Sequence, residues 1–309
     1  MKKPALTIGI CAYNEGANIK VLLLQILGSK PADATINEIL VVSSGSTDST
    51  DSIVSDFCEH DPRIRLIREP ERLGKVSAVN KILKQAKADS DIIIISGADL
   101  QIREDTIDNL ISALEDPCVG MAGARIIPTN APDSFSGFCS HLVWDMHHRI
   151  AMRSPKCGEL IAIRNNGYSI PSDMAIDEAY LEYAVKKDGF SIAYAPDSIV
   201  YNKGPCSTGD YLKQRRRIHA QHMKLKESTG YSVSTSNPAM VLGALASHIS
   251  KSPRSFVYSI GAIGLESVAV FLGSYDFYIA KEDHSVWDVV KSTKDPNSMR
   301  KSKAKGAKV

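Results

Sequence analysis

The stretch that decides the fold is Ile92-Ile93-Ile94-Ile95-Ser96-Gly97-Ala98-Asp99. Four consecutive isoleucines followed by small residues are typical of a strand that is buried on both faces of a parallel sheet. A carboxylate placed directly after such a strand is costly to bury unless a cation compensates for its charge. Asp99 is therefore the first candidate for a ligand-binding residue.

Similar segments alternate along the first 130 residues. Further apolar runs typical of buried strands occupy Leu6–Ala12, Ile39–Val42 and Val119–Ile127. Between the runs, apolar residues recur at helical spacing over Ile19–Leu27, Val79–Ala86 and Ile107–Leu114. Alternating strands and helices predict a doubly wound, mainly parallel α/β sheet, whose ligand binds beyond the carboxyl ends of the strands.

The alternation ends near residue 130. We expect a helix over Asp133–Met152, strands near Leu160–Ile163 and Ser191–Ala195, and a helix beginning at Asp177. Farther on, the stretch Ser255–Ser274 is nearly uncharged and about as long as a membrane span, interrupted only by Glu266. We expect this segment to associate with a membrane, and a buried or dimer-forming helix pair, which would show the same pattern, is the alternative.

Composition narrows the class of protein. The chain has 309 residues, 43% of them hydrophobic and 23% charged, which excludes a disordered chain. A net charge of +2 gives no argument for a nucleic-acid partner, and we expect none. The six cysteines form no CxxC pair, which favours a reducing, cytoplasmic setting over a zinc module or a disulfide scaffold.

Two polar segments follow predicted strands, and a third leads into a predicted helix. The first strand ends in Ala12-Tyr13-Asn14-Glu15, the second in Ser43-Ser44-Gly45-Ser46-Thr47-Asp48-Ser49-Thr50, and a third segment runs from Arg72 through Gly74-Lys75 to Asn80. Small turn residues let backbone amides approach a nucleotide, and Gly45 supplies the tight turn. Thr47 or Asp48 would equally serve as a helix cap. The Lys75 cation would either contact a diphosphate or lie solvated at the surface.

Together these segments resemble glycosyltransferase family 2, over roughly residues 5–230. The resemblance implies a GT-A fold in which the segments surround the nucleotide of a sugar donor. Donor-binding residues implied in this way are Ala12, Tyr13, Asn14, Glu15, Ser43, Gly45, Lys75, Ala98 and Asp99. The family usually has acids where this chain has Ser43 and Ser44, so the identity of the nucleobase stays open.

Asp99 matches the second acid of the family's DxD motif, and Gly97 stands where the first acid would be. The resemblance implies that Asp99 binds a divalent metal, Mg²⁺ or Mn²⁺, together with the donor diphosphate. With one acid missing, phosphate and water oxygens would complete the coordination, which suits a hard cation. A plain helix-capping or turn role for Asp99 is the alternative.

Asp177-Glu178 matches the family's paired acids at the start of a helix near the acceptor. Glu178 aligns with the general base, and Asp177 remains a substitute. Acids also favour the first helical turn for reasons of the helix dipole alone. Gln214-Arg215-Arg216-Arg217-Ile218 resembles the QxxRW signature of processive members, which implies catalytic roles for Gln214 and Arg217. Because Ile218 replaces the tryptophan, we expect single additions instead of polymer synthesis.

The resulting prediction is a metal-dependent inverting glycosyltransferase that moves a hexose from a nucleotide diphosphate sugar to an acceptor hydroxyl. The acceptor would be lipid-linked or a glycan, the setting cytoplasmic or the cytoplasmic face of a membrane, and a homo-oligomer is allowed. Predicted limits are residues 1–232 for the GT-A domain (nucleotide-sugar half 1–130, acceptor half 131–232), 233–290 for a helical apolar region, and 291–309 for a basic tail. A nucleotidyltransferase and an inactive donor-binding protein are the alternatives.

Overall fold

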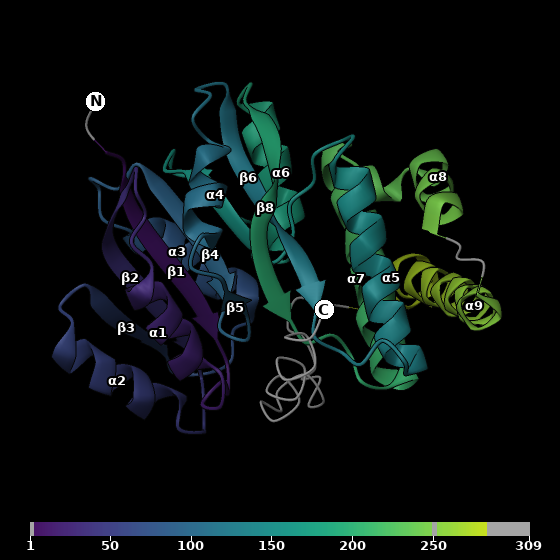
Figure 1. The fold of residues 1–309 in the computed structure, drawn as a ribbon, viewed down its shortest axis with the longest axis horizontal. Helices are drawn as coiled ribbons and strands as arrows, with labels where there is room; N and C mark the ends of the chain where they lie inside the picture. Colours follow the sequence, from purple (N-terminus) through teal and green to yellow (C-terminus); the bar gives the residue numbers. More distant parts are fainter. Residues whose placement is uncertain (1–2, 249–251, 283–309) are drawn as a thin grey trace. The chain divides into compact units, whose positions relative to one another are not determined.

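The computed structural model describes residues 3–248 and 252–282, and it confirms the predicted alternation (Figure 1). The strands are β1 (Ala5–Ala12), β2 (Thr35–Ser44), β3 (Ile64–Glu69), β4 (Ile92–Gly97), β5 (Gln101–Ile102), β6 (Val119–Pro128), β7 (Leu160–Arg164) and β8 (Ser191–Asn202). The α-helices are α1 (Ile19–Gly28), α2 (Thr50–His60), α3 (Lys75–Gln85), α4 (Thr106–Ser112), α5 (Phe135–Ala151), α6 (Asp177–Lys187), α7 (Thr208–Thr229), α8 (Pro238–His248) and α9 (Pro253–Tyr275). Two short turns complete the described elements, a 3-10 turn at Ser234–Ser236 and a π-helical turn at Asp276–Ala280.

The strands form one sheet in the order β3-β2-β1-β4-β7-β6-β8-β5. β1 pairs in parallel with β2 and β4, and β2 pairs in parallel with β3. The carboxyl ends of these strands therefore meet at one edge, where Ala12 lies opposite Ser43 and Cys11 lies opposite Gly97. Helices α1 and α2 cover one face of this part of the sheet and α3 covers the other (Figure 1).

The sheet also contains antiparallel pairs that the sequence did not predict. β7 runs antiparallel to β4, β6 antiparallel to β7, and β5 antiparallel to β8. The edge strand β3 was not predicted either, because its sequence, IRLIRE, mixes charged and apolar residues without a buried run. An edge strand with alternating charge is a usual way to discourage pairing with other chains.

The described residues divide into two compact units. The first contains residues 3–126 and 157–201, and therefore nearly all of the sheet together with α1, α2, α3, α4 and α6. The second contains residues 127–156, 202–248 and 252–282, including α5, α7, α8 and α9. Both units are thus discontinuous in sequence, whereas the predicted domain limits follow chain order. The predicted basic tail, residues 291–309, lies outside the described residues.

A shared apolar core joins the helices of the second unit. Cys139 and Leu142 of α5 are buried with Tyr211 of α7 and Ala262 of α9. Phe135 and Phe138 stack edge-on against Tyr258 of α9. Helix α9 is therefore part of a packed helical body.

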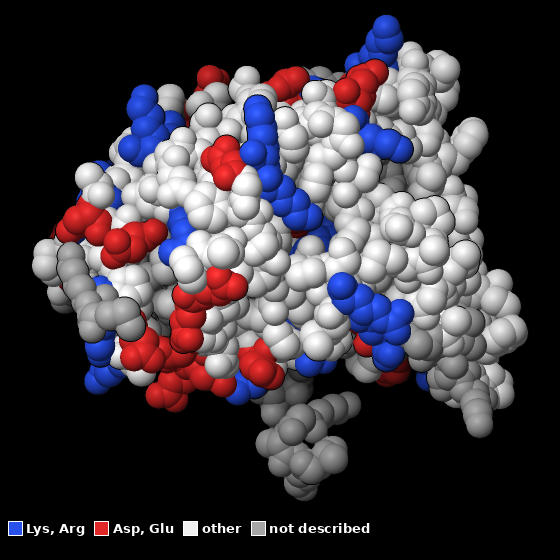
Figure 2. Space-filling model, turned by 90° about the horizontal axis from the view of Figure 1, so that it is seen from above, with Lys and Arg blue, Asp and Glu red and all other residues white. Residues whose placement is uncertain are grey.

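Helix α9 has a polar seam against α7 and an apolar outer face. Arg215 Nη2 lies 2.5 Å from Glu266 Oε1, and His219 Nε2 lies 2.8 Å from the same oxygen. A second ion pair joins Arg216 and Asp276. By length and composition the segment Pro253–Ala280 could span a membrane, and 22% of its most apolar window is buried. The surface over α8 and α9 shows hardly any charge (Figure 2).

Candidate active site

The loops after β1 and β2 are joined by the side chain of Asn14. Its backbone has a positive φ of 51°, a conformation that asparagine tolerates better than most residues. The Asn14 side-chain oxygen accepts a hydrogen bond from Thr47 N at 2.7 Å, and Asn14 N donates to Ser46 Oγ at 3.1 Å. The sequence Tyr13-Asn14 is thus used to fix one loop on the other.

Asp48 adds a second link between the loops, although the N-cap position of α2 belongs to Ser49. Asp48 Oδ1 accepts from Thr50 N at 2.9 Å, at the start of α2, and its Oδ2 accepts from Gly16 N at 3.0 Å. Thr50 Oγ1 in turn accepts from Glu15 N at 2.8 Å. Of the predicted donor-binding residues, Glu15 is buried and bonded to Asn18, so its carboxylate has a structural role here.

Gly45 allows the closest backbone approach in this region. Its φ is +65°, and a Cβ at this position would stand 2.6 Å from the carbonyl carbon of Glu71. Beside it, Ser44 Oγ accepts a hydrogen bond from Leu73 N at 3.1 Å, and Ser43 Oγ donates to Ser46 Oγ at 2.9 Å. The two serines that replace the family's acids therefore hold the loop together.

An aromatic ring and a guanidinium meet above these loops. The Cζ atom of Arg72 lies 4.4 Å from the ring centroid of Tyr13, within the range of a cation–π contact. The three segments predicted from the sequence are thus brought together at one sheet edge in the first unit.

Asp99 follows β4 at the same edge. Ala98 N donates to Cys11 O at 3.0 Å, which fixes the turn that carries Asp99 against the end of β1. The Asp99 side chain is half-buried, and it has no hydrogen bond or ion pair to any residue in 3–248 or 252–282. An acid without a partner at this position fits a cation ligand better than a helix cap, because a cap would be bonded to a backbone amide.

A divalent metal would have one protein ligand here. No group of three or more His, Cys, Asp and Glu side chains is arranged to hold a metal ion in the described parts of the chain. A hard cation can be held by one carboxylate together with substrate phosphates and water. Asp99 fits such a shared site, and it does not fit a cation cage made only of protein ligands.

Lys75 pairs with the two acids at the start of α6. Its Nζ lies 3.0 Å from Asp177 Oδ2 and 2.5 Å from Glu178 Oε1. The Asp177 side chain is 1% exposed, that of Glu178 is 19% exposed, and that of Lys75 is 27% exposed. The alternative of Lys75 as a solvated surface residue is thus wrong, and Asp177-Glu178 does more than favour the dipole of α6.

Burial and the neighbouring charges shift the pKa values of Asp177 and Glu178 in opposite directions. Burial, reinforced by the neighbouring charge of Glu178, raises the pKa of Asp177 to about 7. Burial acts the same way on Glu178, but the attraction of Lys75 outweighs it and leaves the pKa of Glu178 below its ordinary value. Burial would lower the pKa of Lys75, yet the two carboxylates hold it well above its usual range. At neutral pH Lys75 and Glu178 are therefore both ionised.

The comparisons with known proteins agree with this architecture. Glycosyl transferase family 2 matches residues 7–170, which is more than half of the chain. The chain belongs to glycosyltransferase family 2. The sequence-based prediction of the family is therefore confirmed.

Named relatives of this family 2 chain are sugar transferases. It is 25% identical over 240 residues to an N-acetylglucosaminyltransferase of Rhizobium meliloti, covering 69% of this chain and 54% of that protein. It is 30% identical over 109 residues to a dolichyl-phosphate beta-glucosyltransferase of Trichomonas vaginalis, covering 34% and 32%. The chain spans about half the length of the N-acetylglucosaminyltransferases that it matches.

A solved structure shares the fold of this family 2 chain. The mannosyltransferase PcManGT from Pyrobaculum calidifontis, solved in complex with GDP-Man and Mn²⁺, matches with a TM-score of 0.58 at 22% identity. The match covers 100% of this chain and 88% of that one. The predicted GT-A fold with a C-terminal helical region is confirmed.

Gln214 and Arg217 of this family 2 chain belong to the second unit. Both lie on α7, which is capped by the side chain of Ser207 and ends at Gly230 in the left-handed conformation. Arg217 is buried and Gln214 is half-buried. Their neighbours Arg215 and Arg216 are paired with Glu266 of α9 and with Asp276 of the turn after it, so these two arginines do not form a free basic face. Catalytic roles for Gln214 and Arg217 stay predictions.

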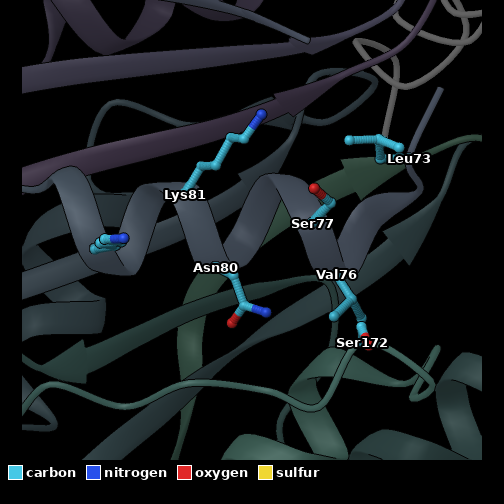
Figure 3. Close-up of a pocket in the computed structure, with 7 residues that line it drawn as sticks. Leu73, Val76, Ser77, Asn80, Lys81 and Ser172 are labelled. Carbon is cyan, nitrogen blue, oxygen red and sulfur yellow. The ribbon is translucent and has the colours of Figure 1, made fainter. Parts of the chain in front are cut away.

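One pocket lies along α3, and it contains none of the predicted catalytic or metal-binding residues (Figure 3). It measures about 240 Å³ and is lined by Leu73, Val76, Ser77, Asn80, Lys81, Lys84 and Ser172. Asn80 clamps the opposite loop by two hydrogen bonds to the backbone of Ile170. Lys81 is paired with Glu69 at 2.9 Å.

Sequence reasoning missed several residues that shape the site. Arg72 was quoted only as the start of a segment, yet it covers the Tyr13 ring. Ser46 and Thr50 fix the loops through their hydroxyls, and Cys11 lies where the charges of Lys75 and the acid pair reach it. No spacing signal marks such contacts, because they depend on how separate loops meet.

Proposed function

We propose that this chain is a metal-dependent inverting glycosyltransferase that transfers a hexose from a nucleotide diphosphate sugar to an acceptor hydroxyl. The observation that carries the proposal is Asp99. Its carboxylate, without a partner among the described residues, lies at the sheet edge where the loops after β1 and β2 meet. Family membership and relatives that transfer N-acetylglucosamine or glucose support the reaction class.

The donor nucleotide would lie on the interlocked loops. Tyr13 and Arg72 offer a flat, cationic surface, and the loop around Gly45 exposes backbone where a side chain would collide with Glu71. Because Ser43 and Ser44 bind the loop itself, nucleobase contacts would come from other groups. Asp99 would hold the divalent cation, which when bound neutralises charge on the leaving diphosphate.

Glu178 would act as the general base. In an inverting transfer the acceptor oxygen attacks the anomeric carbon, the bond to the diphosphate breaks, and a base takes the hydroxyl proton. Glu178 is the more accessible acid of the pair and is ionised at neutral pH, so it can accept that proton. Asp177, 1% exposed, is less able to reach an acceptor. Gln214 and Arg217 would assist the leaving group, as the resemblance implies.

Product analysis with a panel of nucleotide sugars and Mn²⁺ or Mg²⁺ tests the reaction. Release of a nucleoside diphosphate with inverted configuration at the transferred sugar is expected. Release of pyrophosphate would instead show a nucleotidyltransferase. Binding of donors without any turnover, with acceptors ranging from free sugars to polyprenyl phosphates, would show an inactive donor-binding protein.

We further propose that α9 lies in a membrane interface and does not span the bilayer. Glu266 and Asp276 are paired with arginines of α7, and a spanning α9 would have to give up these partners or carry them into hydrocarbon. On the opposite side, α9 exposes Phe256, Val257, Ile260, Phe271 and Tyr275, and the π-helical turn after it exposes Tyr278. Aromatic residues at the end of an apolar face favour the headgroup region. A lipid-linked acceptor would fit this placement.

Sedimentation with vesicles of mixed zwitterionic and anionic lipids tests the membrane proposal. The full chain should co-sediment, and Phe271→Ser combined with Tyr278→Ser should lower the bound fraction about tenfold, since each removes apolar burial. Leu24→Ser is a matched control, because Leu24 is also exposed but lies on α1. Equal binding by the double variant, or an unbound full chain, would contradict the proposal.

A further inference from the structure

Lys75 occupies an electrostatically unusual position. It is the first residue of α3, after Gly74 with a φ of 88°, where the positive end of the helix dipole disfavours a cation. Asp177 and Glu178 occupy the first turn of α6, where acids are favoured. The ammonium is thus kept at the end of α3 by the two carboxylates, at 3.0 and 2.5 Å.

The same ammonium lies close to the strand edge that carries Asp99. Cys11 at the end of β1 is near enough for the charges of Lys75, Asp177 and Glu178 to act on its thiol, whose pKa burial raises. Cys11 pairs in register with Gly97, two residues before Asp99. Lys75 is therefore paired with the proposed base, and its charge reaches the end of β1, which lies beside the strand that leads to Asp99.

We propose that donor binding draws Lys75 from the acid pair to the diphosphate, and that Asp177 is a positioning residue that takes up a proton when Lys75 leaves. The proposal rests on the proposed function. In the donor-free chain Lys75 holds Glu178 as a weak, ion-paired base. Once the Lys75 ammonium has moved to the diphosphate, Glu178 is free to take the proton of the acceptor hydroxyl.

Charge balance sets the direction of proton movement. The groups whose charges act on Lys75 are Cys11 of β1 and Asp177 and Glu178 of α6, and Glu69 of β3 acts on Cys11. Glu69 keeps its own partners, Lys81 and Ser77, so it is not left uncompensated. Removing one positive charge from two adjacent carboxylates makes full ionisation of both unfavourable. One proton from solvent is then expected on the buried Asp177, which leaves Glu178 ionised.

Calorimetric titration of the full chain with UDP and with GDP, in the presence of Mn²⁺, measures this proton. At about pH 8 the nucleotide phosphates are already ionised, and repeating the titration in buffers of different ionisation enthalpy gives the number of protons taken up. We expect uptake approaching about one proton per bound diphosphate for the wild type. Binding without proton exchange would overturn the inference.

Variants separate the cation transfer from a merely structural role. Lys75→Met should weaken diphosphate binding about tenfold and abolish proton uptake, whereas Lys75→Arg should retain both in part. Asp177→Asn should bind the diphosphate with Lys75 intact but without uptake, which keeps the test valid if Lys75→Met does not fold. Lys84→Met is the matched control, because Lys84 is exposed on the same helix and has no ion pair among the described residues. Uptake unchanged in Lys75→Met would contradict the inference. If no nucleoside diphosphate binds the wild type, the proposed function itself fails.

Discussion

The Oδ1 atom of Asp99 lies 2.7 Å from the point where a Cβ on Gly97 would stand. The Asp99 carboxylate, at the second acid position of the DxD motif, therefore occupies the space that a side chain at the first position would need. Gly97 is the residue that permits this, because any side chain there would displace Asp99. The position of the Asp99 carboxylate thus depends on the absence of a side chain at residue 97.

Gly97→Ala should weaken metal-dependent binding of a nucleoside diphosphate about tenfold, since the new methyl group pushes the Asp99 carboxylate aside. Folding should be nearly unaffected, because the displaced atom is the end of a flexible side chain. Titration calorimetry with Mn²⁺ measures the affinity. Gly28→Ala is the control, because nothing lies within 4 Å of a Cβ at that helix end. Unchanged affinity in Gly97→Ala would show that the position of Asp99 over Gly97 is unimportant.

Gly45→Ala should destabilise the first unit by about 1–3 kcal/mol and reduce donor binding. Alanine at a φ of +65° is strained, and its Cβ would also meet the backbone of Glu71 at 2.6 Å. Denaturant unfolding measures the stability. Gly167→Ala separates the two effects, since Gly167 has a φ of +74° but open space around it. An equal loss in both variants would show that only backbone conformation matters.

Asp177 should make folding less favourable as pH rises. Its pKa is about 7 in the folded chain against an ordinary value of 3.8, so the folded state binds more protons between these values. The free energy of unfolding that depends on this group therefore falls as pH increases from about 4 to 7, by at most about 4 kcal/mol at 1.36 kcal/mol per pKa unit.

Asp177→Asn should remove that fall. We expect the difference in melting temperature, variant minus wild type, to be larger at pH 8 than at pH 5. Thermal unfolding followed by circular dichroism at both pH values gives the comparison. Parallel changes in the two proteins would mean that Asp177 does not titrate in this range.

The parallel half of the fold could be predicted because most of its strands are continuous apolar runs, which indicate burial on both faces. Runs such as Ile92–Ile95 are apolar on both faces, and the polar residues after them necessarily meet at one edge. The edge strand β3 lacks such a run, and nothing in a single sequence states that β7 pairs antiparallel with β4. Long-range pairing depends on the whole sheet.

The sequence names candidate residues for the site but not the contacts between them. Asp99 was singled out by its place after a buried strand, and Asp177-Glu178 by its resemblance to the family's paired acids. The pairing of Lys75 with that acid pair joins residues more than 100 positions apart, and no local pattern records it. The same holds for Glu266, whose partners on α7 explain how a charge persists in an apolar helix.

The most direct measurement is the affinity of UDP and GDP for the full chain with and without Mn²⁺, in the wild type and in Asp99→Asn. Because Asp99 has no partner among the described residues, the substitution should leave the melting temperature of the free chain within a few degrees of the wild type. We predict that Mn²⁺ tightens binding about tenfold or more in the wild type and has no such effect in Asp99→Asn, which should also lose sugar transfer. Equal metal-dependent affinity and full transfer activity in Asp99→Asn would contradict the assignment of the donor site.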